Sequence, residues 1–310
     1  MNGTTHDRTM PAFGSAVITG ATGFLGTNLC GRLHACGVRV TGLVRSTSDA
    51  SRRAKLEALG TVMETDGSVA SLTDALRDAN PDLVFHLAAN YVGTHGPDDV
   101  APLLSDNVGL TASLCEAATT AQCHALVAAG TAWQNAGSAP GNPSPSPNTL
   151  YAATKQAADE IIGYYARARD LNAITLKIYD SYGPDDPRRK FLAVLTETAA
   201  RGETLRASPG DQQLHMVHVD DLIDGFTHAG NRLASGTAKG YESYTLPSIK
   251  AVTLRELADV WQVATGVRAE IEWGATPHRP GEVLTPWEGT PLPGWRPTIS
   301  LEDGLRRLQD

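Results

Sequence analysis

The sequence predicts an α/β fold in which helices wind over both faces of a parallel sheet, with a smaller C-terminal lobe. Three observations predict it. Short apolar segments alternate with helix-like segments up to Ile178, which is the pattern of parallel strands joined by crossover helices. A glycine-rich turn joins the first apolar segment to the first helix. After Pro184 the alternation weakens and prolines and loops become frequent.

The first elements follow from hydrophobic periodicity and from end signals. Residues 15–19 form a short apolar strand. The helix after it carries Leu25, Leu29 and Leu33 on one face and stops at Gly37. The second strand is expected at residues 38–44.

A third strand is expected at residues 62–64, and a helix follows over 72–79. The pattern Ser71-x-x-Asp74 predicts a capping box at the start of that helix, and Pro81 follows its end. The later elements are expected as a strand at 83–87, a helix at 107–122, a strand at 125–129, a loop at 137–148, a helix at 151–169 and a strand at 173–178.

Composition excludes several classes of function. The 310 residues include 26 basic and 34 acidic side chains, a net charge of −8 that argues against nonspecific nucleic-acid binding. No run reaches the roughly 18 apolar residues of a membrane span, and the polar start has no signal-peptide core, so a cytoplasmic protein is expected. The cysteines lack metal-ligand spacing; we expect reduced thiols and no metal at Cys30, Cys36, Cys115 and Cys123.

The glycine-rich turn reads Gly-Ala-Thr-Gly-Phe-Leu-Gly over residues 20–26, between a strand and a helix. That context is the one a dinucleotide fingerprint requires. The first glycine allows the turn, the second lets backbone approach a pyrophosphate, and the third allows close helix–strand packing. The turn predicts a Rossmann-type fold. The cofactor contacts expected here are Gly20, Thr22, Gly23, Phe24, Leu25 and Gly26.

The end of the second strand indicates which dinucleotide binds. An NAD site usually carries an acid there for the ribose 2′-hydroxyl, whereas this chain has Arg45 and then Ser46. An arginine suits a 2′-phosphate, so the sequence favours NADP(H) over NAD(H). The alternative is a solvated arginine beside an NAD site. Asp66 and Gly67 follow the third strand and could meet the adenine, or form an ordinary turn.

A tyrosine and a lysine four residues apart form the candidate catalytic pair. Tyr151 and Lys155 share one face of a predicted helix. A nearby ammonium favours the phenolate and would bring the tyrosine pKa nearer to working pH. Thr131, just after an apolar strand, is the candidate for orienting the reacting oxygen. The same spacing is common on exposed helices, and only its place after a Rossmann half favours catalysis.

With these motifs assembled, the chain resembles the extended short-chain dehydrogenase/reductases, the nucleotide-sugar epimerase/dehydratase group, from about Phe13 onward. Further landmarks agree, namely residues 86–89, 182–184, 217–221, 279–282 and 294–297. The resemblance implies further cofactor contacts at Leu87, Ala88, Ala89, Asn107, Ile178 and Tyr179. It implies substrate contacts at Asn90, Trp133, Asp180, Arg188, Lys190, His218 and Arg279, with Arg279 meeting the diphosphate of a nucleotide sugar.

Departures from the family pattern narrow the expected activity. Dehydratases of this group carry Asp-Glu after the threonine, whereas Ala132 and Trp133 stand here. Many relatives carry an arginine where Leu214 and His215 stand. The basic residues 188–190 could replace it, or simply start a solvated helix. The chain looks most like CDP-abequose synthases and related 4-ketoreductases.

The resemblance therefore implies NADPH-dependent reduction of a nucleoside-diphosphate 4-keto-6-deoxyhexose. The alternatives are a nucleotide-sugar 4-epimerase, a non-catalytic NADP(H) sensor and a reductase of a ketone without a nucleotide. We expect a disordered tail over residues 1–12, a dinucleotide-binding domain over 13–179 and mainly a substrate lobe over 180–310, with 214–245 returning to the first domain. A homodimer is a family expectation.

Overall fold

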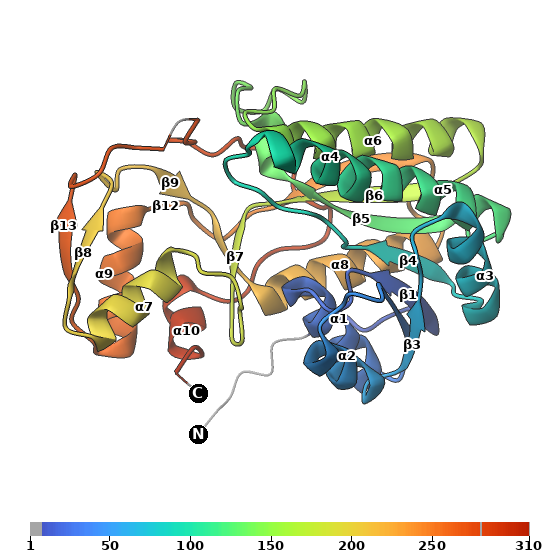
Figure 1. Ribbon diagram of the computed structural model, residues 1–310, viewed down its shortest axis with the longest axis horizontal. Helices are drawn as coiled ribbons and strands as arrows, with labels where there is room; N and C mark the ends of the chain where they lie inside the picture. Colours follow the sequence, from blue (N-terminus) through green and yellow to red (C-terminus); the bar gives the residue numbers. More distant parts are fainter. Residues whose placement is uncertain (1–7, 280, 310) are drawn as a thin grey trace.

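The computed structural model describes residues 8–279 and 281–309. Seven parallel strands form one sheet in the order β11-β6-β5-β4-β1-β2-β3 (Figure 1). Chain order reverses between β1 and β4, the position where doubly wound sheets open a ligand-binding crevice. The strands are β1 (Ser15–Thr19), β2 (Arg39–Val44), β3 (Thr61–Glu64), β4 (Leu83–His86), β5 (Ala125–Thr131), β6 (Asn172–Ile178) and β11 (Tyr241–Leu246). The doubly wound fold predicted from the sequence is confirmed.

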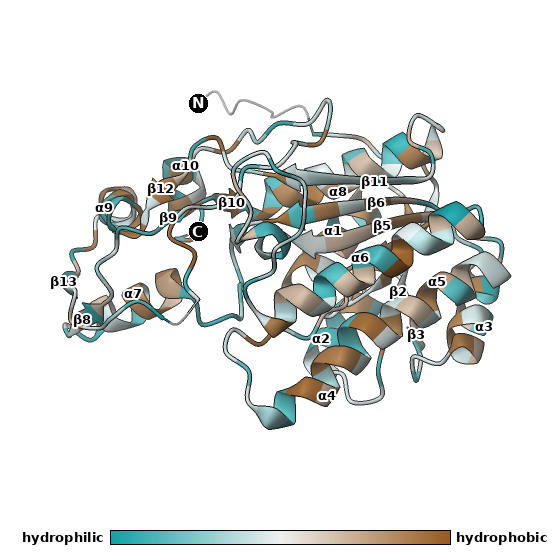
Figure 2. Ribbon diagram, turned by 90° about the horizontal axis from the view of Figure 1, so that it is seen from above, coloured by the Kyte–Doolittle hydropathy of each residue, from teal (hydrophilic) through white to brown (hydrophobic). Residues whose placement is uncertain are grey.

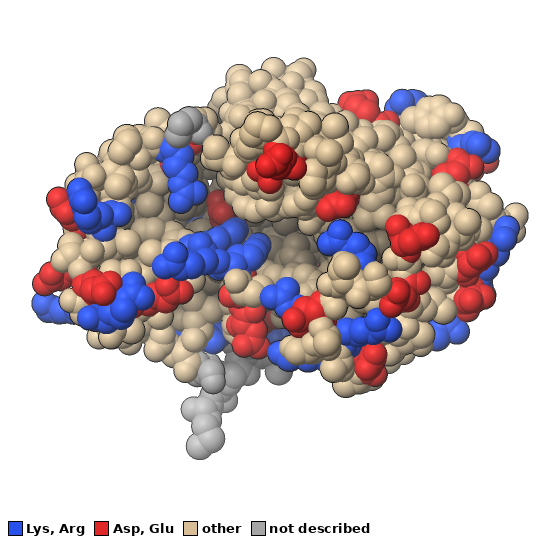
Figure 3. Space-filling view, viewed as in Figure 1, with Lys and Arg blue, Asp and Glu red and all other residues tan. Residues whose placement is uncertain are grey.

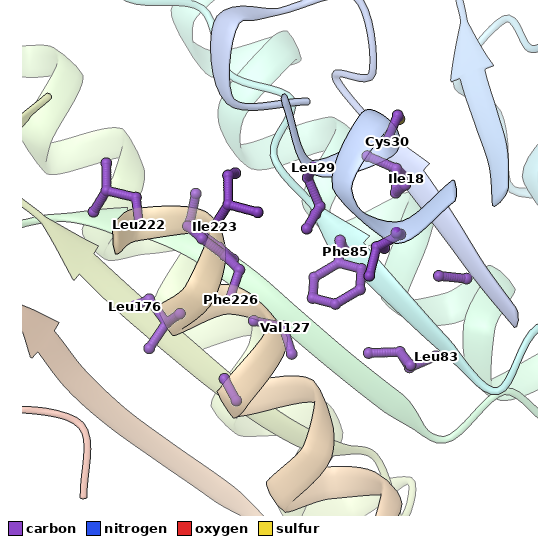
Figure 4. Packing of buried hydrophobic residues seen from close by; sticks show 14 of the residues in the cluster. Ile18, Leu29, Cys30, Leu83, Phe85, Val127, Leu176, Leu222, Ile223 and Phe226 are labelled. Atoms are coloured by element: carbon purple, nitrogen blue, oxygen red, sulfur yellow. The ribbon is translucent and has the colours of Figure 1, made fainter. Parts of the chain in front are cut away.

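Helices cover both faces of this sheet (Figure 1). One face carries α1 (Phe24–Ala35), α2 (Ala50–Glu57) and α8 (Val219–Ala234), and the other carries α3 (Val69–Ala79), α4 (Val100–Leu103), α5 (Leu110–Thr120) and α6 (Leu150–Ala168). Figure 4 shows Leu29, Phe85 and Phe226 packed in the core of the first face. Burying each such side chain contributes about 1.5–3 kcal/mol, so the sheet is a rigid base for residues at its edge.

A smaller lobe lies beside the carboxyl ends of the strands (Figure 2). Its core is built around Trp261, which is 1% exposed. The lobe consists of α7 (Phe191–Ala200), β8 (Thr204–Ala207), β9 (Gln213–Leu214), β12 (Val252–Thr253), α9 (Leu254–Thr265), β13 (Glu270–Trp273) and α10 (Leu301–Arg306). Two short parallel strands, β7 (Asp180–Tyr182) and β10 (Met216–His218), join it to the sheet. The chain then returns to the sheet through α8 and β11, which pairs with β6.

Two helix starts differ from the sequence expectation. The cap of α3 is Ser68, whose side chain accepts a hydrogen bond from the Ser71 N–H at 3.2 Å, so the capping box expected at Ser71 is wrong. Leucine spacing defined the buried face of α3 but not the length of its polar first turn. Asn107 does not open a helix either: it lies within a single turn of π-helix, η2 (Leu104–Gly109), between α4 and α5.

Part of the expected N-terminal tail lies within the described residues. Its residues 1–7 lie outside the described part of the chain. The Thr9 N–H donates to Asp224 Oδ1 at 2.7 Å, and the Ala12 N–H donates to Asn231 Oδ1 at 2.6 Å. These acceptors lie on α8, so the tail prediction fails for residues 9–12, which polar side chains far along the chain hold in place. Within the described residues, no helix is long and apolar enough to cross a membrane.

Candidate active site

The glycine turn between β1 and α1 leaves no room for side chains. Gly20 has φ +69°, and a Cβ there would lie 2.6 Å from the Ala88 nitrogen. A Cβ on Gly26 would collide with the Gly20 carbonyl oxygen and lie 2.7 Å from the Ala21 Cα. Gly23 caps α1 in an extended conformation. The first turn of α1 is thereby drawn close to the strand edge, and its free N–H groups form a suitable anion-binding site.

A hollow of about 210 Å³ lies at the carboxyl ends of β2 and β3. Ser46, Glu64, Thr65, Asp66 and Ser71 line it. The Asp66 carboxylate accepts a hydrogen bond from the Ser68 N–H at 2.9 Å, which lowers the pKa of Asp66. The glycine turn and this hollow thus offer a phosphate cradle and a recess farther along the same sheet edge, as a dinucleotide requires.

Arg45 stands at the edge of this region with an exposed guanidinium. Its side chain is 71% exposed, and its Nη1 lies 3.5 Å from Asp106 Oδ2. Exposed pairs of this kind are worth only about 0–1 kcal/mol, so an anion could displace Asp106. A second guanidinium reaches the glycine turn, since Arg52 Nη1 lies 3.5 Å from the Thr22 carbonyl oxygen.

Thr131 ends β5 and caps the 3₁₀ turn η3 (Ala132–Asn135). Its Oγ1 accepts a hydrogen bond from the Trp133 N–H at 3.3 Å, and its own N–H donates to Gln134 Oε1 at 2.8 Å. The hydroxyl oxygen of Thr131 therefore accepts a hydrogen bond that holds it in place. Within the part of the chain that the structure describes, its own hydrogen has no acceptor and can bond to a further oxygen.

Tyr151 and Lys155 lie in the first turns of α6. Lys155 is 4% exposed, and burial lowers its pKa to about 8 against the opposing charge of Asp159. Burial also raises the pKa of Tyr151; Tyr91 adds to that effect and Arg188 opposes it. The expected lowering of the tyrosine pKa by Lys155 is wrong for this structure, because burial is the largest cause acting on Tyr151 and Lys155 is not among the groups that shift its pKa. Tyr151 keeps its proton.

The loop after β4 is fixed against α6 through Asn107, which is 1% exposed. The Asn90 N–H donates to Asn107 Oδ1 at 2.7 Å, and Asn107 Nδ2 donates to the Asn90 carbonyl at 2.9 Å. The same Nδ2 donates to Thr154 Oγ1 at 2.9 Å. Both polar groups of the Asn107 side chain are hydrogen-bonded to other residues of the protein. Asn107 therefore positions the loop that contains Leu87, Ala88 and Ala89.

Two other predicted site residues are engaged in packing. Tyr179, just after Ile178 at the end of β6, donates its hydroxyl to the Trp287 carbonyl at 2.7 Å. His218 is 2% exposed and caps α8, its Nδ1 accepting from the Asp220 N–H at 3.2 Å. Burial lowers the pKa of His218 to about 4. Tyr179 thus ties the end of β6 to the C-terminal segment, and His218 caps the helix that follows it.

Basic side chains gather on the lobe side of the depression at the centre of the face shown in Figure 3. Arg188 lies over the Phe24 ring, 4.5 Å from its centroid, and Lys190 Nζ lies 3.1 Å from Asp180 Oδ1. Arg188 also binds Asp186 at 2.6 Å. Arg279 is exposed. The positive charges of Arg279 and Arg188 both lower the pKa of the Tyr91 phenol, so both lie near enough to Tyr91 to act on it.

Sequence reasoning missed a polar network behind the candidate catalytic pair. Gln134 Nε2 donates to Asp159 Oδ2 at 2.8 Å, while its Oε1 binds the Thr131 N–H. Asp159 lies one turn beyond Lys155 on α6 and is 6% exposed. The spacing of four residues from Lys155 was a visible signal for Asp159. Nothing in the sequence linked Gln134 to it.

Comparison with known proteins agrees with this geometry. Residues 16–243 match the model of the NAD dependent epimerase/dehydratase family. This chain belongs to that family.

A UDP-glucose 4-epimerase of Mycolicibacterium smegmatis is 28% identical over 94% of this chain and 96% of that protein. A CDP-abequose synthase of Yersinia pseudotuberculosis is 26% identical over 87% of this chain and 90% of that protein. Among solved structures, MoeE5 in complex with UDP-glucose and NAD is 26% identical with a TM-score of 0.78, covering 94% of this chain and 96% of that one.

Proposed function

We propose that this protein is an NADPH-dependent reductase of a nucleoside-diphosphate 4-keto-6-deoxyhexose. The observation that carries the proposal is Arg45: an exposed guanidinium, paired with the half-buried Asp106 carboxylate at 3.5 Å, stands where an NAD site has an acid. The similarity to a CDP-abequose synthase over most of both chains supports it. The glycine turn and the hollow beyond it fit the pyrophosphate and adenosine parts of the cofactor.

The site residues divide the work of a carbonyl reduction. When bound, NADPH supplies the hydride for the ketone carbon. Tyr151 donates its phenolic proton to the ketone oxygen, so the product is an alcohol and the tyrosine becomes a phenolate. Thr131 directs its free hydroxyl hydrogen at the same oxygen and stabilises the charge that develops there. Lys155, whose side chain is an ammonium below pH about 8, holds the nicotinamide ribose.

A nucleotide-sugar 4-epimerase is the second candidate. The full-length similarity to the Mycolicibacterium smegmatis enzyme favours it, as does the NAD named with the MoeE5 structure. That reaction would begin with Tyr151 accepting a proton from a sugar hydroxyl. Burial raises the pKa of Tyr151, which favours a tyrosine that starts as a proton donor.

Cofactor stoichiometry separates the two functions. Purified protein is incubated with NADPH and a nucleoside-diphosphate 4-keto-6-deoxyhexose while NADPH absorbance is followed. The proposal predicts one NADPH oxidised per sugar and a product heavier by two hydrogens. Turnover of a nucleoside-diphosphate hexose at constant mass, without NADPH consumption, would establish the epimerase instead.

A further inference from the structure

An exposed tyrosine joins two aromatic residues of the site. The Tyr91 ring meets Tyr151 edge to face, with centroids 5.0 Å apart and an interplanar angle of 84°. On its other side it meets Trp133, with centroids 6.1 Å apart. The three rings come from the loop after β4, from α6 and from η3. Tyr91 thus stands at the point where these elements converge on the proton donor.

The position of Tyr91 is fixed although its side chain is largely outside the core. The preceding residue, Asn90, is hydrogen-bonded through both its N–H and its carbonyl to the buried Asn107. Tyr91 is nevertheless 56% exposed. A Cβ on Gly93 would lie 3.2 Å from the Tyr91 hydroxyl, so the phenol lies over a residue without a side chain. An exposed aromatic ring held beside a catalytic group is typical of a ligand-contact surface.

The charges around Tyr91 describe what it would contact. Burial of its phenol and the Asp180 carboxylate raise the pKa of Tyr91, while Arg279 and Arg188 oppose them. Its hydroxyl is therefore close enough to Arg188 and Arg279 to feel their positive charge. Its ring lies against Tyr151. A ligand with an anionic group near the arginines and a reacting carbon near Tyr151 would pass across the ring between them.

We propose that Tyr91 determines substrate specificity by forming, with Trp133, the aromatic wall on which the pyranose ring of the substrate lies. This inference rests on the proposed function and deepens it. The C–H face and the C5 methyl of a 6-deoxyhexose bury apolar surface on such a wall, whereas a 6-hydroxyl would lose water there without a matched partner. Tyr91 therefore selects the 6-deoxy sugar, and its hydroxyl hydrogen-bonds one sugar oxygen.

Binding measurements test this separately from catalysis. Calorimetry is run with UDP-glucose, UDP-6-deoxyglucose and UDP, together with their cytidine counterparts, at saturating NADP⁺. The variants are Tyr91→Ala, which removes the wall, and Tyr91→Phe, which keeps the ring. Tyr164→Ala is the matched control, because Tyr164 is another exposed tyrosine, 53% exposed, on the helix that carries Tyr151.

Tyr91→Ala is expected to weaken the 6-deoxy conjugate by about 3- to 10-fold, in the range of one aromatic contact. It should abolish the preference over the 6-hydroxy conjugate and leave UDP, CDP and NADP⁺ within about twofold. Tyr91→Phe should keep the preference, and the Tyr164 control should change nothing.

Unchanged binding of the sugar conjugates by Tyr91→Ala would overturn the inference. So would an equal loss for the nucleoside diphosphates, because that would indicate a distorted site. The unmodified protein could bind the conjugates through Tyr91 and yet fail to oxidise NADPH with a 4-keto sugar. That result would refute the reductase function and leave the role of Tyr91 in sugar binding intact. Failure to bind any conjugate would overturn both.

Discussion

Replacement of Arg45 should weaken the binding of NADPH much more than that of NADH. The protein partner of its guanidinium is the Asp106 carboxylate at 3.5 Å, with side chains 71% and 33% exposed. Such a pair is worth about 0–1 kcal/mol, so Arg45→Ala should leave the free energy of unfolding nearly unchanged. A charge-assisted hydrogen bond to a 2′-phosphate is worth roughly 1.5–3 kcal/mol. The variant should therefore raise the Kd for NADPH by about 10- to 150-fold and change that for NADH by less than about twofold.

The assay is a titration of each cofactor into the unmodified protein, Arg45→Ala and Asp106→Asn. The Asp106 variant removes the carboxylate that competes for Arg45, so it should tighten NADPH by up to about fivefold and leave NADH unchanged. The affinity gain should shrink at high salt, because exposed charges are screened. Equal Kd values for NADPH and NADH in the unmodified protein, or an equal loss of both in Arg45→Ala, would refute the assignment.

Three further predictions concern the catalytic pair and the glycine turn. Tyr151→Phe should lower kcat by about 10²- to 10⁴-fold and leave the Kd for NADPH unchanged; activity within a few-fold of the unmodified protein would point to another proton donor. Asp159→Asn removes the charge that opposes burial of Lys155, so the pKa of Lys155 should fall below about 8 and the alkaline limb of the kcat/KM profile should move to lower pH; an unmoved or raised limb contradicts this. Gly26→Ala should lower Tm and abolish cofactor binding because its Cβ meets backbone, whereas Gly31→Ala in the same helix, with its nearest atom at 4.0 Å, should do neither.

The sheet and its helices were predictable because periodicity determines which residues are buried. The apolar spacing of β1 and α1, and the turn between them, can be recognised from the local sequence without knowing which elements pack against them. The polar ends of helices were harder to predict. Ser68 and Ser71 both resemble N-cap residues, and only the packing of α3 decides between them. The π turn at Asn107 has no pattern of its own, since it arises where the side chain of Asn107 clamps the loop after β4.

The motif residues of the candidate site were visible in the sequence, but their surroundings were not. Spacing placed Tyr151 and Lys155 on one helix face, yet the burial that raises the pKa of the tyrosine depends on the loop that brings Tyr91 beside it. His218 lay in a family landmark, and tertiary packing uses it as a helix cap. Motif spacing describes one element at a time, whereas these properties come from several elements together.

The most direct test of the central claim follows the hydride itself. NADPH carrying deuterium at C4 on the transferred face is supplied in excess with a nucleoside-diphosphate 4-keto-6-deoxyhexose, and the isolated sugar is examined by mass spectrometry and NMR; both faces are labelled in separate preparations. The account predicts one deuterium at C4 of the product from one of the two preparations, with Tyr151→Phe forming that product about 10²- to 10⁴-fold more slowly. A product without deuterium from either preparation, formed while NADPH remains unconsumed, would contradict an exchangeable NADPH as the reductant.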